Sequence, residues 1–310
     1  MSLLGVTDPH PDESVAGFLI RSLRGTGSHI RDILELRNGH RRRVLNFGDA
    51  ATFAVVTGVA QGWFEYRLPQ PLQGDGWQEL QLFGRRWRGD WTVRGSRQQI
   101  CTRCIAEAGI ARLEWDLTGY FACHVHACVL IDSCSACGRA ISVDRPSLDV
   151  CSCGHFLDGP EHVASEIAVQ WCQAISDTLA SEAQTVSSTA RLPSLLYGLS
   201  LDGAYRLLIA CGGGSRVLQA TLRHGDTPWL TSATVHALAC RSLERLGQLG
   251  QGMDLRLSLE QDVADSLAEQ QTRGVSAFDR ASASRVLALT GLRSNRRTRR
   301  KGIHEQLQLF

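Results

Sequence analysis

Apolar residues recur at helical spacing near the start of the chain. Asp12 and Ser14 precede an apolar series whose members stand three, one and four residues apart: Val15, Phe18, Leu19 and Leu23. This spacing places the four side chains on one face of a helix, which we expect to end near Gly25 or Gly27.

Two more helices are predicted before residue 63. The second begins after Ser28 and ends at Gly39, and the third runs from Asp49 through Ala60 and stops at Gly62. Three short helices joined by tight turns predict a helix-turn-helix-like bundle. Proteins use this arrangement both to bind DNA and to dock on other proteins.

The pattern changes over residues 63–99, where tryptophans and glycines are too irregularly spaced for one helix. We expect loops and short strands here. Three arginines stand close to Trp87 and Trp91: Arg85, Arg86 and Arg88. They are interpreted as solvated arginines above packed aromatic rings, with a nucleic-acid patch as the alternative.

Helical periodicity returns after Gly154. Helices are predicted over residues 160–183, 192–199, 201–211, 232–249, 258–271 and 278–289. The serine- and threonine-rich run 185–189 is predicted to be a linker, and Gly212 to Gly214 mark a break. The predicted fold class is mainly α with small β.

Cysteines are concentrated in the middle of the chain, where eight of the eleven lie between Cys101 and Cys153. Most stand in short pairs with Cys-x-x-Cys, Cys-x-x-His or Cys-x-Cys spacing. Two such pairs, separated by 13 to 18 residues, can close a tetrahedron around Zn²⁺. In chain order they predict two structural zinc ions. The first site contains Cys101, Cys104, Cys123 and His126, and the second contains Cys134, Cys137, Cys151 and Cys153.

Other pairings stay open at this point. A cross-braced arrangement, in which the first and third pairs share a metal, is compatible with the seven residues between His126 and Cys134. The candidate substitute ligands are His124, Cys128 and His155. We interpret His124 as a surface histidine and Cys128 as a buried thiol. Three later cysteines on apolar helical faces are interpreted as core thiols: Cys172, Cys211 and Cys240.

The residue types argue against catalysis. Four protein ligands leave no open metal position for a substrate or an activated water, so the expected role of the metals is to replace a hydrophobic core. A zinc deaminase would need His-x-Glu before Pro-Cys-x-x-Cys, and the sequence has neither. No paired-carboxylate or Ser/His/Asp arrangement stands out. We therefore expect no enzymatic activity.

Composition and charge add the expected surroundings. The chain has 310 residues, a net charge of +2 and no run of 18 apolar residues, and its start is polar, so we expect a cytoplasmic protein with reduced thiols. Positive charge is concentrated between residues 293 and 301: Arg293, Arg296, Arg297, Arg299, Arg300 and Lys301. Such a run either contacts nucleic-acid phosphates or remains a solvated tail.

Several motifs occur together in a characteristic order. They are Pro11-Asp12-Glu13-Ser14 leading to Arg21, then Cys101-x-x-Cys104, Trp115, Cys123-x-x-His126, Leu130 and Cys134-x-x-Cys137-Gly138. With them the chain resembles the TniQ family over about residues 9–154. The tight spacing of Cys151 and Cys153 departs from this pattern, which leaves His155 open as the last ligand of the second site.

The resemblance implies an accessory protein of bacterial heteromeric transposons that helps to choose the target site. Such proteins work with an AAA+ ATPase regulator and a DDE-type transposase, and some couple to a CRISPR guide-RNA effector or dimerise. Family members have an N-terminal helix-turn-helix unit, a zinc-ribbon centre and a helical C-terminal part. The eight metal positions named above are those that the resemblance carries over.

The domain organisation follows from these expectations. It comprises an N-terminal helical domain with an aromatic and arginine-rich connector (1–98), a tandem zinc-ribbon region (99–158), a helical C-terminal domain (159–292) and a basic tail (293–310). The expected function is a non-enzymatic adaptor in DNA transposition, linking a DNA site or guide-RNA complex to an AAA+ regulator. The alternative is a stand-alone zinc-ribbon, helix-turn-helix regulator that binds a specific DNA sequence.

Overall fold

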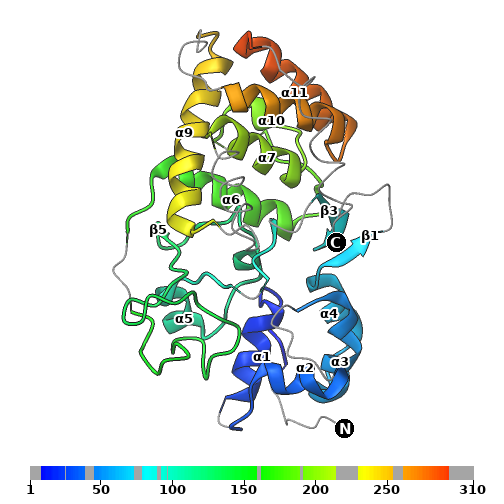
Figure 1. The fold of residues 1–310 in the computed structure, drawn as a ribbon, viewed down its shortest axis with the longest axis vertical. Helices are drawn as coiled ribbons and strands as arrows, with labels where there is room; N and C mark the ends of the chain where they lie inside the picture. Colours follow the sequence, from blue (N-terminus) through cyan, green and yellow to red (C-terminus); the bar gives the residue numbers. More distant parts are fainter. Residues whose placement is uncertain are drawn as a thin grey trace, which may run out of the picture. The chain divides into compact units, whose positions relative to one another are not determined.

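The computed structural model describes residues 8–24, 26–38, 45–72, 79–88, 92–95, 97–158, 162–188, 191–213, 230–253 and 261–292. By their internal contacts the residues form two compact units (Figure 1). The first lies within Met1–Gln184 and Thr227–Ala237, and the second within Thr185–Asp226 and Leu238–Phe310. Among the described helices, none has the length and apolar character needed to cross a membrane.

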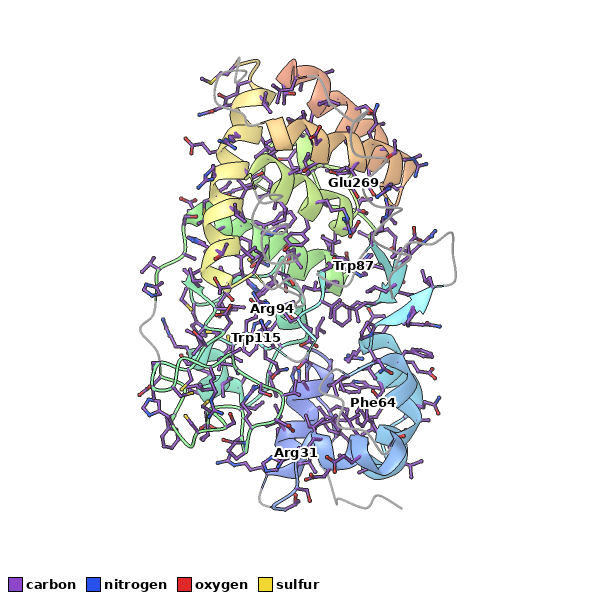
Figure 2. The ribbon with its side chains drawn as sticks, in the orientation of Figure 1. Arg31, Phe64, Trp87, Arg94, Trp115 and Glu269 are labelled. Atoms are coloured by element: carbon purple, nitrogen blue, oxygen red, sulfur yellow. The ribbon has the colours of Figure 1, made fainter. Side chains whose placement is uncertain are left out.

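Short helices form the beginning of the first unit: α1 (Val15–Leu23), α2 (Ile30–Asn38), the 3-10 helix η1 (Phe47–Asp49), α3 (Ala50–Thr57) and α4 (Gln61–Arg67). Their core is aromatic. The ring of Phe18 lies 5.3 Å from that of Trp63 and 6.1 Å from that of Phe64, and Phe53 lies 5.7 Å from Phe64. Figure 2 shows Phe64 among these helices. The four residues of α1 that were predicted to share one apolar face, Val15, Phe18, Leu19 and Leu23, are all buried.

The third helix is not continuous, which corrects the prediction that it runs on to Gly62. It ends at Thr57 because Gly58 adopts a left-handed conformation with φ of 76° and donates its N–H to the carbonyl of Ala54. Gly62 lies inside α4. At Gly58 the chain needs a positive φ, which glycine adopts readily, and the spacing of the glycines did not reveal which of the two ends the helix.

The predicted short strands form an antiparallel sheet in the order β1 (Gln70–Leu72), β2 (Glu79–Leu82) and β3 (Arg85–Arg88). The arginines of β3 are not uniformly solvated, which corrects the sequence interpretation. Arg86 is exposed and pairs with Glu79, whereas Arg85 is buried and donates to the carbonyls of Thr178, Ser181 and Ala183. These carbonyls lie at or beyond the end of α6 (Glu166–Ala180), so Arg85 caps that helix.

A buried polar network joins distant parts of the first unit. Asp132 accepts hydrogen bonds from Arg94 at 3.1 Å and from the backbone N–H of Ser232 at 2.5 Å. The Ser232 hydroxyl lies 2.8 Å from Oε1 of Gln99. Figure 2 labels Arg94 and Trp115, both of which are buried in this unit. Because Ser232 is hydrogen-bonded to both Asp132 and Gln99 in a buried site, the network fixes residues 230–237 in the first unit.

The second unit is helical: the 3-10 helix η4 (Ser194–Leu196), α7 (Leu201–Cys211), the later part of α9 (Ser232–Gly250), α10 (Gln261–Arg273) and α11 (Ala277–Thr290). The predicted helix over 201–211 is confirmed. The predicted helix over 192–199 is reduced to η4. The predicted linker is instead packed, because Val186 is buried and donates its N–H to the carbonyl of Leu199.

One buried carboxylate organises the helix starts of the second unit. Asp279 accepts from the backbone N–H of Ser276, which caps α11, and from the N–H and hydroxyl of Ser200, which caps α7. A Cβ atom at Gly203 would lie 2.3 Å from Oδ1 of Asp279, so only glycine fits there. The architecture is mainly α with small β, as the sequence predicts.

Candidate metal centres

The first Cys/His cluster is built from a helix and a hairpin. The helix α5 (Thr102–Ala108) begins directly after Cys101 and carries Cys104 in its first turn. The hairpin of β4 (Ala122–Cys123) and β5 (Cys128–Val129) supplies Cys123 and His126. The turn reverses at Ala127, whose φ of 49° is left-handed. This reversal returns His126 toward Cys123, and the His126 N–H lies 3.4 Å from the Cys123 sulfur.

The donor atoms of this cluster converge. Nδ1 of His126 lies 3.3 Å from Sγ of Cys101, 3.2 Å from Sγ of Cys104 and 3.5 Å from Sγ of Cys123. The sulfurs of Cys104 and Cys123 are 3.5 Å apart. A tetrahedron with Zn–S bonds of about 2.3 Å and a Zn–N bond of about 2.0 Å separates sulfurs by about 3.8 Å and sulfur from nitrogen by about 3.5 Å. Both the donor types and their separations fit zinc.

The second cluster is built from two glycine-ended turns. Gly138 and Gly154 have φ of 67° and 87° and donate their N–H groups back to the carbonyls of Cys134 and Cys151. The Cys134 and Cys153 sulfurs lie 3.8 Å apart, as do those of Cys137 and Cys151. These separations equal the value of about 3.8 Å expected for a tetrahedral zinc site with four thiolates.

The structure groups the eight predicted donors in chain order. The four donor atoms of each set lie within 4.8 Å of one another: Cys101, Cys104, Cys123 and His126 in one, and Cys134, Cys137, Cys151 and Cys153 in the other. Pairs one and three, which a cross-braced site would join, are not brought together in either set. The tight Cys151-x-Cys153 spacing therefore still brings both thiols to one centre.

The candidate substitute ligands have other partners. Nδ1 of His124 lies 2.6 Å from the hydroxyl of Tyr120, and Nε2 of His155 lies 3.4 Å from a carboxylate oxygen of Asp158. Cys128 is buried, as expected, but its sulfur lies 3.8 Å from that of Cys101, beside the first cluster. Its place across from Cys123 in the hairpin causes this approach, and no spacing motif in the sequence indicated it.

The thiols of each cluster shift one another's pKa in opposite directions. The hydrogen bond between Cys101 and Cys104 lowers the pKa of Cys101 to about 7 and raises that of Cys104. In the second cluster a hydrogen bond with Arg139 lowers the pKa of Cys137 to about 6, whereas burial raises the pKa of Cys151 to about 11. A metal binds the thiolate rather than the thiol, so metal binding must displace the protons that remain on Cys104 and Cys151. The other predicted site, Arg293 to Lys301, lies outside the described residues.

The Pro11–Ser14 segment is hydrogen-bonded to the N-terminal helices and to the chain that follows α5. Glu13 is fully buried, and its carboxylate accepts from Nε of Arg21 at 2.9 Å and from Nη2 at 2.8 Å. Ser14 caps α1 by accepting the N–H of Gly17 at 3.0 Å. Arg67 of α4 donates to the carbonyls of Pro11 and Glu13.

The same segment contacts the chain that follows α5. The N–H of Ser14 donates to the carbonyl of Ala111 at 2.9 Å, and the N–H of Leu113 donates to the carbonyl of Asp12 at 2.9 Å. These backbone bonds hold α1 against the residues between the two halves of the first cluster. The Pro-x-Glu-Ser and arginine motif therefore has a structural role: it joins the N-terminal helices to the region of the first metal centre.

Comparison with known families supports the same part of the chain. The TniQ family model matches residues 5–130. This part of the chain matches the TniQ domain. The match extends from the N-terminal helices through β5, and it includes the whole first cluster and the Pro11–Ser14 segment. The second cluster lies beyond the matched TniQ domain. No curated protein matches the chain.

A TniQ domain indicates a transposition-associated protein that takes part in target selection. The two clusters support zinc binding alongside it, because each offers a complete four-donor set of thiols and imidazole. In this TniQ domain the helices, the Glu13 ion pair and the first cluster belong to one compact unit.

Proposed function

We propose that this protein is a non-enzymatic adaptor for target-site selection in DNA transposition. It links a targeting element, either a DNA site or a guide-RNA complex, to an AAA+ transposition regulator. The observation that carries the proposal is the TniQ match over residues 5–130. The Glu13–Arg21 ion pair supports it, because it places the motif residues in a structural role that positions helices rather than in a reaction.

The surfaces of α3 and α4 favour docking on a protein over base recognition. Across α3, which is described in full, every side chain is apolar or a threonine, and Val55 is 69% exposed. In α4 the only basic residue is Arg67, which is held by backbone carbonyls, and Gln61 donates its side-chain N–H to Glu65 at 2.7 Å. Base edges in the major groove are read mainly by arginine, lysine, asparagine and glutamine. These two helices therefore offer little for sequence readout.

Two zinc ions have a structural role in this proposal. Each cluster would hold one ion, the first through three thiols and an imidazole and the second through four thiols. The ions would cross-link a segment that has few strands and only short helices. Residues 97–158 are then rigid enough to keep the N-terminal helices in one orientation. The protein contributes surfaces to an assembly, and the chemistry of strand transfer belongs to a DDE-type transposase.

The proposed partners are the AAA+ regulator, the transposase complex, and DNA or a CRISPR guide-RNA effector. The proposed compartment is the bacterial cytoplasm, where thiols stay reduced and available to metal. A homodimer is compatible with this function.

Targeted transposition in cells that carry the cognate transposase and AAA+ regulator tests the proposal. Removing this protein should abolish insertions at the selected site while the purified transposase still cleaves transposon ends. Purified protein should bind DNA only weakly by itself and be retained on target in the presence of the regulator or the guide-RNA complex. Nanomolar, sequence-dependent DNA binding by the isolated protein would favour the stand-alone regulator instead.

A further inference from the structure

The histidine of the first cluster has a second partner on its far side. Nδ1 of His126 faces the three thiols, whereas Nε2 lies 2.9 Å and 3.0 Å from the two carboxylate oxygens of Glu107. The imidazole is nearly buried, with 5% of its side chain exposed, and the Glu107 side chain is 60% exposed. The ring is therefore held between the cluster and one carboxylate.

The helix α5 explains why this carboxylate is there. Cys101, Cys104 and Glu107 stand three residues apart, and residues three apart lie on the same face of a helix. One short helix and its N-cap residue thus supply two thiols and the group that contacts the histidine. The carboxylate needs no other element to position it.

We propose that Glu107 is the positioning residue of the first metal centre, holding His126 as the Nε2–H tautomer so that Nδ1 binds the metal. A neutral imidazole has one N–H and one lone pair. An ionised carboxylate can accept hydrogen bonds but cannot donate them. Nε2 must therefore carry the proton, and Nδ1 presents its lone pair to the metal position between the thiols. The negative charge of Glu107 also makes the imidazole a stronger donor. The inference requires that the first cluster holds a metal ion.

The second cluster gives an internal control, because its four donors are all thiols. Any effect transmitted through an imidazole must be confined to one of the two centres. A general loss of stability would affect both centres.

Cadmium-113 NMR of the full-length chain can separate the two centres, because sites with three thiolates and one imidazole and sites with four thiolates resonate at different positions. Nitrogen-15 labelling of histidine reports which ring nitrogen binds the metal. The variants are Glu107→Ala, Glu107→Gln and, as a control, Glu182→Ala, which removes an exposed carboxylate of the same unit. Alanine has a higher helix propensity than glutamate, so Glu107→Ala should not weaken α5 through helix propensity.

In the parent protein we expect Nδ1 of His126 to bind the metal and Nε2 to carry the proton. Glu107→Ala should shift the resonance of the three-thiol centre and weaken metal binding there by about 10- to 100-fold, with the four-thiol centre unchanged. Glu107→Gln should recover part of the affinity, because an amide oxygen also accepts the Nε2 proton. Glu182→Ala should change neither centre.

Metal bound through Nε2 would overturn the proposal, as would an unchanged first centre in Glu107→Ala. Equal weakening of both centres would also overturn it, because that result identifies Glu107 as a residue of general stability. The proposal would also fail if the first cluster took up no cadmium, because it requires a metal ion at that centre. The adaptor function is judged separately, by transposition.

Discussion

Glu13 and Arg21 form an ion pair in which the carboxylate is completely buried and both of its oxygens accept hydrogen bonds from one guanidinium. Parallel hydrogen bonds of this kind fix the orientation of both groups. Since the flanking backbone bonds to Ala111 and Leu113, the pair determines how α1 leaves the Pro11–Ser14 segment. Two residues of the family motif are thereby explained by packing.

Removing the cation of this pair should be costly. Arg21→Ala leaves the Glu13 carboxylate buried without its main partner, and we expect the free energy of unfolding to fall by about 3 kcal/mol. Urea denaturation monitored by tryptophan fluorescence measures it. Arg86→Ala is the matched control: it removes an arginine paired with Glu79 at the surface, where the expected loss is below about 1 kcal/mol. Equal losses would refute the structural role of Glu13.

Gly17 marks the closest approach of α1 to the chain after α5. A Cβ atom there would lie 2.7 Å from Cβ of Ala111 and 3.1 Å from its carbonyl oxygen. Gly17→Ala should therefore destabilise the protein by about 1–3 kcal/mol, although alanine is the better helix former.

Gly62→Ala is the control for this substitution, because Gly62 also lies in a helix but has nothing within 4 Å of the added atom. It should be neutral or stabilise by up to about 1 kcal/mol. Thermal denaturation of the two variants measures the difference, and a stabilised Gly17→Ala variant would contradict the close packing.

Metal removal should act on the first unit. Elemental analysis of the purified protein should find two zinc ions per chain, and Cys104→Ser and Cys137→Ser should each retain one. After chelation, hydrogen exchange should accelerate across residues 97–158 and remain slow in α7 and α11, because both clusters belong to the first unit. Faster exchange only in the second unit would contradict this assignment.

Asp116 should make folding pH-dependent. Burial raises the pKa of this carboxyl from 3.8 to about 7, assisted by Glu114 and opposed by Arg145. Between these two pKa values the folded state binds more protons than the unfolded state, so stability falls as pH rises from about 4 to about 7.

Asp116→Asn cannot ionise and should escape this loss. Relative to the parent protein, its free energy of unfolding should be about 2 kcal/mol higher at pH 8 and unchanged near pH 4. The value at pH 8 is smaller than the full pKa shift would give, because the Asp116 side chain is partly exposed and solvent screens its charge. Urea denaturation of both proteins at both pH values measures this difference in stability. Comparing the variant with the parent at the same pH removes the contribution of the other titrating groups, which both proteins share. A gain that does not depend on pH would refute the assignment to Asp116.

Local sequence patterns predicted much of the candidate sites. The short spacings of the cysteines named the four donor pairs, because ligands two or three residues apart necessarily lie near one another. The apolar period of α1 predicted its buried face, and the residues of α7 were predicted from end to end. In each case the information lies within one short, continuous stretch of the chain.

Contacts between distant residues were not predictable in this way. Nothing local distinguishes Arg85, which caps α6, from the exposed Arg86, or Gly58, which ends a helix, from Gly62, which does not. Cys128 lacks a paired neighbour in the sequence, yet the hairpin places it beside Cys101.

The sequence by itself determined the residue types: which positions can bind zinc, which faces are apolar, and which motif accompanies them. Only the tertiary structure decided how these are used. It selected the sequential grouping of the eight donors, set Glu13 against Arg21 in a buried site, and turned His126 so that its two nitrogens face different partners. The physical reason is that burial and hydrogen-bond geometry depend on segments of the chain that are distant in sequence. A local pattern does not contain the positions of those segments.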